Sequence, residues 1–228
     1  MNNTPVLVHQ AALLNREGIA ALSCGNSAKA HACFKHVLEI MGYITQFPNL
    51  PQGHAATAWL QGVSPVSIPN FDNERFFIYN CALMFQPVAS PNFTQLDITL
   101  YSAAAIFNMA LAYHQRAVQT AGSSSASGML RIAARMYDQC LQIVRSLPAG
   151  IESDASALVL IVLNNRSHIY FETQNYEKAS AMLDHVQRLS RSMVRHNAVG
   201  GPVLQTESFE EIALNVLVTT RPSTAACA

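Results

Sequence analysis

Histidine and cysteine are the residues of this chain best suited to catalysis or metal binding, but their spacing favours neither. Cys33 and His36 are three residues apart, within reach of each other on a helix, yet apolar neighbours such as Phe34 predict a raised thiol pKa and an unreactive cysteine. No carboxylate or cysteine joins His114 and His168 at the spacing of metal ligands, and no H-E-x-x-H motif occurs. We interpret both histidines as core or groove residues and expect no metal.

Motifs for nucleophilic catalysis and nucleotide binding are absent from the sequence. G-x-S-x-G, G-x-x-x-x-G-K-[ST] and G-x-G-x-x-G do not occur. The serine-rich stretch 119–129, QTAGSSSASGM, offers no lysine to a phosphate, so we interpret it as a solvated loop. We expect a protein that is not an enzyme and uses no cofactor. An enzyme whose site is assembled from residues that no motif reveals stays as an alternative.

Composition limits the partners and the compartment. Lys plus Arg (14) balance Asp plus Glu (14), so no basic field attracts nucleic acid or an anionic membrane. Five widely spaced cysteines without a C-x-x-C pair indicate reduced and mostly buried thiols. There is no signal-like N-terminus, and the apolar run 98–113 is shorter than the ~20 residues of a membrane span. We expect a cytoplasmic or nuclear protein.

The elements that must position these residues are helical hairpins. In Asn165–Leu183 and its flanks, apolar residues recur at three- and four-residue steps on both sides of a break at Gln174-Asn175. Asn175 is a suitable N-cap for the second helix. Near the N-terminus, Thr4-Pro5 begins a similar unit, with its break at 24–27.

These units resemble the tetratricopeptide repeat, whose pattern combines a large residue, a helix-contact glycine, a small residue and an aromatic at fixed spacing. The N-terminal unit matches it at Leu14, Gly18, Gly25, Ala30, Phe34 and Val37, and departs from it at Glu17, Ala21 and Gly42. The unit around Asn165 matches at Leu163, Ser167, Tyr170, Tyr176, Ala179, Leu183 and Val186, and departs at Arg166, Gln174 and Arg191. The small residues let the two helices of a hairpin cross closely.

A third unit lies between these two, with matches at Ile106, Met109, Ala110, Tyr113, Ala133, Tyr137 and Cys140. Its helices are joined by the long loop 119–129 instead of a tight turn. The resemblance covers 8–46, 95–147 and 154–196. It implies an all-α fold of about three antiparallel hairpins, stacked as a short right-handed solenoid in one domain, 1–228.

A Pro- and Gly-rich insertion, 47–93, interrupts the repeats. Within it, Phe76–Gln86 is dense in aromatic and aliphatic residues and predicts a strand. A single strand needs a partner, and Ile212–Thr220 in the C-terminal segment 206–220 is β-branched and alternating. We therefore expect a small two-stranded β-ribbon of 76–86 with 212–220. The alternative is a capping helix over Phe209–Val218.

The resemblance also implies a site. First helices of tetratricopeptide repeats line a concave groove, and some members place Asn there to bind the backbone of an extended peptide; an amide can both donate and accept. The alternative is that these asparagines satisfy backbone groups between helices or in loops of the chain itself. The cations with which some relatives bind a C-terminal carboxylate are replaced by Ala12, Ala104 and Ile161. The candidate groove residues are Asn15, Arg16, Asn108, His114, Gln115, Asn165, His168 and Glu172.

The function predicted from these observations is a non-enzymatic scaffold or adaptor that binds a protein or peptide segment in the groove. The alternative is a self-assembling structural protein, a homo-oligomer, because charged residues are only 12% and FFIYNCALMF looks exposed. The sharpest expectation concerns Asn165. It should face an open concave surface if the repeat interpretation is right, and should be buried in an irregular core if it is wrong.

Overall fold

The structure is a computed structural model that describes residues 4–47, 63–67, 78–85, 93–147, 152–195 and 210–215. Its helices are α1 (Thr4–Ser23), α2 (Ser27–Ile44), α4 (Gln95–Gln119), α5 (Ala126–Arg145), α6 (Glu152–Glu172) and α7 (Tyr176–Arg195), followed by a short helix over 210–215. Two short strands, β1 (Val63–Ser67) and β2 (Cys81–Phe85), lie between α2 and α4. The protein is mostly helical, which confirms the predicted all-α class.

The helices begin and end where local chemistry satisfies their free backbone groups. The side chain of Asn26 accepts a hydrogen bond from Lys29 N at the start of α2, and Asn175 accepts one from Lys178 N at the start of α7. Thr94 and Asp97 form a reciprocal capping box at the start of α4. Helix α1 begins at Thr4, as predicted.

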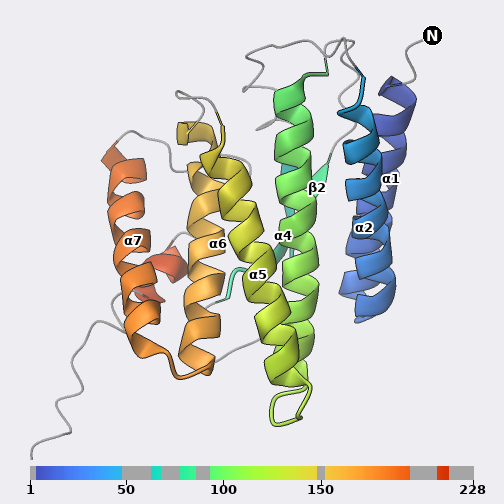
Figure 1. Ribbon diagram of the computed structural model, residues 1–228. Coiled ribbons are helices and arrows are strands. Elements are labelled where there is room, and N and C mark those ends of the chain that lie inside the picture. The colour runs from blue at the N-terminus through green and yellow to red at the C-terminus, as the bar shows by residue number, and fades with distance from the viewer. Residues whose placement is uncertain are drawn as a thin grey trace, which may run out of the picture.

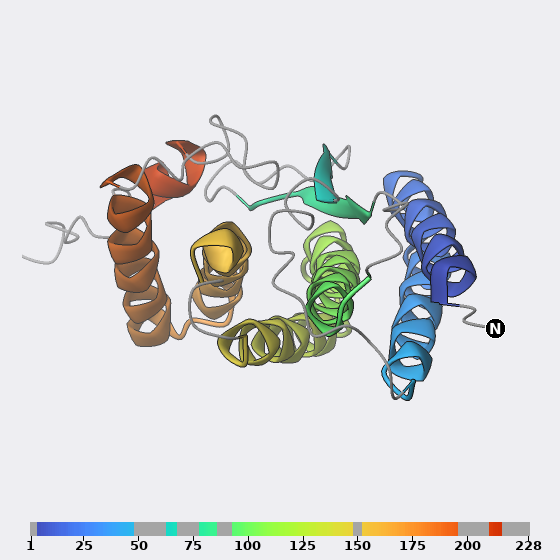
Figure 2. The same ribbon diagram turned by 90° about the horizontal axis from the view of Figure 1, so that it is seen from above.

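The helices pack as three hairpins, α1 with α2, α4 with α5 and α6 with α7, in the regions where the sequence predicts its three units. Neighbouring hairpins contact each other through α2 with α4 and α5 with α6, so the hairpins form a row (Figure 1). Seen from above, β2 crosses the side of the row formed by α1, α4 and α6, opposite α5 (Figure 2). The candidate site lies on this face.

Small residues stand where the paired helices cross. A Cβ atom at Gly18 would lie 2.6 Å from Cε1 of Phe34, so only glycine fits beneath that ring. Ala110, Ala133 and Ser167 are fully buried, and Ala179 is nearly so. The close approach at Gly18 is the contact that the small residue of the pattern predicts, and the other four small residues are buried as a helix contact requires.

The ribbon differs from the predicted one. Residues 81–85 of the predicted strand 76–86 are extended, but β2 pairs antiparallel with β1, with Pro65 opposite Leu83. The predicted pairing with 212–220 is wrong, because 210–215 is helical. Ile212 and Asn215 are buried three residues apart, while Leu214 is exposed, which is a helical and not an alternating pattern. The alternative, a C-terminal helix, is confirmed for these residues; 206–209 and 216–220 lie outside the described residues.

The predicted loop 119–129 is too long at both ends. Gln119 is the last residue of α4, and α5 already begins at Ala126, so the connection is 120–125. Met129 N donates to Ser125 O, which closes the first turn of α5. A serine-rich composition did not prevent the helix, because Leu130 and Ala133 behind it pack into the core.

Candidate peptide-binding groove

The clearest site of the molecule is a pair of asparagine clamps that hold the extended segment 78–85. Leu83 N donates to Asn108 Oδ1 over 2.8 Å, and Asn108 Nδ2 donates to Leu83 O over 2.8 Å. Asn165 binds Tyr79 in the same way. Tyr79 N donates to Asn165 Oδ1 over 2.8 Å, and Asn165 Nδ2 donates to Tyr79 O over 2.9 Å. Each amide therefore binds both main-chain groups of one residue.

The spacing of the clamps matches an extended chain. Tyr79 and Leu83 are four residues apart, so in a strand their main-chain groups point to the same edge, roughly 13 Å apart. Asn108 lies on α4 and Asn165 on α6, the first helices of two successive hairpins. Because β1 occupies the other edge of β2, residues 81–85 lie between β1 and the clamp at Leu83.

Asn15, on α1, supports the clamp at Leu83. Its Nδ2 donates to Leu83 O over 3.0 Å, and its Oδ1 accepts from Asn108 Nδ2 over 3.1 Å. Asn15, Asn108 and Asn165 are all fully buried. The three amides thus form one ladder across three helices, and every contact they make with the segment is to its main chain.

Aromatic side chains fix the segment at both ends. Tyr79 is fully buried, with its ring 6.1 Å from that of Phe107. Phe85 stacks on Tyr101 with 4.7 Å between the ring centroids. Burial raises the pKa of Tyr79 well above its usual value. The segment is held as core, with only Asn80 and Met84 half-buried.

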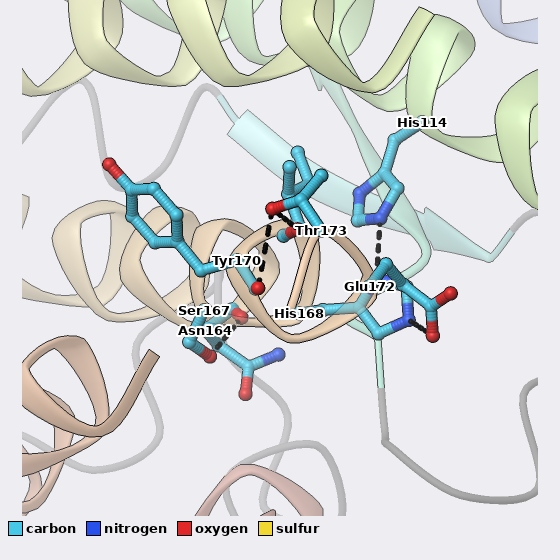
Figure 3. Close-up of polar contacts among 8 residues, drawn as sticks. His114, Asn164, Ser167, His168, Tyr170, Glu172 and Thr173 are labelled. Carbon is cyan, nitrogen blue, oxygen red and sulfur yellow. Dashed lines mark hydrogen bonds and ion pairs between the residues drawn. The ribbon is translucent and has the colours of Figure 1, made fainter. Parts of the chain in front are cut away.

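A chain of hydrogen bonds leads from the clamp at Tyr79 to the surface. Asn165 Nδ2 donates to Tyr137 Oη over 3.2 Å, and Tyr137 Oη lies 3.3 Å from His114 Nδ1. His114 Nε2 lies 2.8 Å from His168 Nδ1, and His168 Nε2 lies 3.5 Å from Glu172 Oε1. Figure 3 shows the two imidazoles facing each other, with Glu172 beyond His168.

The clamp at Tyr79 sets which group donates and which accepts in each of these hydrogen bonds. Tyr79 N donates to Asn165 Oδ1, so the Asn165 amide nitrogen faces Tyr137, whose oxygen accepts and whose hydrogen goes to His114 Nδ1. Neutral His114 then carries its hydrogen on Nε2 and donates to His168 Nδ1. His168 Nε2–H is left for the Glu172 carboxylate. We name this series, from Asn165 to Glu172, the histidine relay.

Burial keeps the inner groups of the histidine relay neutral. It lowers the pKa of His114 well below its usual value, and the neighbouring His168 lowers it further. Burial likewise raises the pKa of Tyr137 far above its usual value. The carboxylate of Glu172 is half-exposed at the outer end. The relay is therefore a polar network inside an apolar core, with one end at the asparagine clamp of Tyr79 and the other at the surface.

The structure brings together most of the candidate residues, but not in an open groove. The expectation that Asn165 faces an open surface is wrong, because the chain's own segment 78–85 covers it. Asn108 and Asn165 instead match the alternative, in which the asparagines satisfy backbone groups of the chain itself. His114 and His168 are buried in the relay, Gln115 is buried, and its Oε1 has no hydrogen-bond partner. Arg16 is exposed, and no described contact joins it to the segment.

Sequence reasoning missed two participants. Tyr137 was matched only as a packing residue of the repeat, and Asn164 was not among the candidate residues. Asn164 Oδ1 accepts from Asn215 Nδ2 over 2.7 Å and so fixes the C-terminal helix. The signal for the occupant was the apolar run 76–86 itself, an extended segment in need of a partner beside a set of unassigned asparagines.

The described cysteines lie mostly in the core. Of the described cysteines, Cys33, Cys81 and Cys140 are buried and Cys24 is exposed. Burial raises the pKa of the Cys33 thiol, as predicted, and raises that of Cys140 to about 12. Within the described ranges, no group of three His, Cys, Asp or Glu could hold a metal ion.

A surface pocket of about 620 Å³ lies where α4 and α6 end, lined by the 120–125 loop and by Glu172. Its lining has hydroxyl groups but no lysine or arginine.

One described helix, α4, is long and apolar enough to cross a membrane, but 78% of its most apolar stretch is buried in the fold. That degree of burial also fits the core helix of a folded domain.

Comparison with family models, with curated proteins and with solved structures found no match to this chain.

Proposed function

We propose that the protein is a non-enzymatic scaffold or adaptor of the tetratricopeptide type, whose three hairpins form a short right-handed solenoid and whose groove binds an extended segment of a partner protein. The row of hairpins, the glycine under Phe34 and the small residues at the helix crossings support the solenoid. No metal, cofactor, nucleic acid or membrane enters this proposal.

The observation that carries the proposal is the pair of asparagine clamps. Amides that bind both main-chain groups of a residue hold an extended chain whatever its side chains, which is how grooves and sheet edges bind peptides. The resident segment 78–85 occupies the groove in the way that we assign to a partner. Self-assembly loses one of its two motivating observations, because residues 78–85 of the apolar stretch are not exposed in the folded chain; the low content of charged residues, 12%, still favours it.

The resident segment competes with any partner. A tethered segment acts at an effective concentration of roughly millimolar, so only the open fraction of the protein is ready to bind. The apparent affinity for a partner is the intrinsic affinity multiplied by that fraction. A substitution that releases 78–85 should therefore strengthen binding in trans.

Titration of the full-length protein with a library of extended peptides tests this function. Leu83→Pro removes the N–H that donates to Asn108, whereas Met84→Ala, at the half-buried next position, leaves both clamps in place and serves as the control. We expect the proline variant to bind library peptides more tightly than the wild type. Adding Asn108→Ala and Asn165→Ala should abolish that binding, and unchanged binding in this variant would reject the groove.

A further inference from the structure

We infer that the groove selects a partner segment of defined sequence: an aromatic residue, any residue, two small residues, leucine, any residue and an aromatic residue, as in Tyr79–Phe85. This inference rests on the proposed function and names the partner of the same groove. The partner is an extended strand from another protein.

The two clamps fix the register of such a segment. They hold positions one and five of the pattern, the positions of Tyr79 and Leu83, through main-chain N–H and C=O groups. A proline at either position would lack the N–H that the asparagine oxygen accepts. A shift by one residue would turn the wrong main-chain edge toward the clamps and move every side chain to the opposite face.

The side chains then distinguish one sequence from another. Ala82 and Leu83, at positions four and five, are fully buried, and Cys81 at position three is 6% exposed, which leaves no room for larger groups. The aromatic positions one and seven rest against Phe107 and Tyr101. Asn80 and Met84 are only half-buried, so positions two and six tolerate change.

Overpacking a buried position typically costs enough to weaken binding about 5-fold or more. We therefore expect Ala82→Leu in a peptide to weaken binding by at least about 5-fold. The matched change at a tolerant position, Met84→Gln, should alter it less than about 3-fold. Leu83→Pro in the peptide should remove binding altogether.

The experiment uses fluorescent peptides of sequence 78–85 with solubilising flanks, Cys81 replaced by Ser, and anisotropy as the readout. The receptors are two full-length variants that eject the resident segment by different means, Leu83→Pro and Ala82→Asp, each checked for helicity by circular dichroism. A receptor that has lost its helicity is replaced by the other. Saturable binding with the stated order of peptide affinities supports the inference.

Two results would overturn it in different ways. If library peptides bind in an asparagine-dependent manner while the 78–85 peptide binds no better than its scrambled form, the sequence pattern is wrong and the groove function stands. If neither the 78–85 peptide nor any library peptide binds either folded receptor, both the pattern and the proposed function fail.

Discussion

At Gly18 the first two helices approach so closely that a single methyl group decides the fit. Gly18→Ala would place a Cβ atom 2.6 Å from the Phe34 ring, and such overpacking costs about 1–3 kcal/mol, more than the ~1 kcal/mol gained in helix propensity. We expect a lower free energy of unfolding by urea denaturation. Gly42→Ala is the control, because nothing lies within 4 Å of its Cβ, and it should stabilise by about 0.5–1 kcal/mol. Equal effects would refute the close crossing.

The asparagine ladder predicts a rank order of destabilisation. Asn108→Ala leaves the buried Leu83 N–H without an acceptor, at about 1–3 kcal/mol. Asn15→Ala removes one of two donors to Leu83 O, so about 1 kcal/mol is expected, because Asn108 still donates. Chemical unfolding of the two variants measures both values. An Asn15 variant as unstable as the Asn108 variant would contradict the assigned roles.

Single residues also show how much of the site the sequence could reveal. Asn108 and Asn165 could be predicted as backbone-binding amides, because the repeat pattern assigns them to first helices. The residues that they bind could not be predicted, because Tyr79 is 86 positions from Asn165 along the sequence and Leu83 is 25 positions from Asn108. The hydrogen-bonding groups of a side chain can be read from the sequence, but tertiary topology decides which segment they bind.

At the scale of elements, the hairpins were predictable and the ribbon was not. Apolar residues at helical spacing, caps such as Asn26 and small residues at crossings all act within one hairpin and can be read locally. Strand pairing depends on distant segments. The β-branched residues of Ile212–Thr220 favour a strand, but tertiary contacts hold 212–215 in a helix. Asn215, bound to Asn164, is such a contact.

The histidine relay joins α4, α5 and α6 and predicts a pH dependence of stability. Burial depresses the pKa of His114, so below about pH 6.5 the unfolded chain binds a proton that the folded chain refuses. The free energy of unfolding should fall by up to about 1.4 kcal/mol per pH unit in that range. His168, Tyr137 and the Glu172 carboxylate are the relay's other titratable groups.

Urea unfolding between pH 7 and pH 5 measures this slope. His114→Gln should reduce it, even though the variant is less stable at pH 7, whereas His36→Gln on the exposed face of α2 should leave the slope as in the wild type. If His114→Gln keeps the full slope, the acid sensitivity arises elsewhere and the relay is not its cause.

For the whole molecule, the proposed function requires the groove to open while the helices stay folded. The segment 78–85 contributes buried aromatics and four clamp hydrogen bonds, but the hairpins pack on each other without it, through α2 with α4 and α5 with α6. Release of the segment is therefore expected as a local opening, with a lower free energy than global unfolding.

Hydrogen exchange in increasing denaturant tests that opening. The amides of Tyr79 and Leu83 should exchange with a lower opening free energy and a smaller denaturant slope than those of Leu111 and Leu163, which are buried in the middle of α4 and α6. Asn108→Ala should lower the value at Leu83 more than the value at Leu111. If all four amides share one free energy and one slope, the segment leaves only when the protein unfolds, and no partner strand can replace it in the native state.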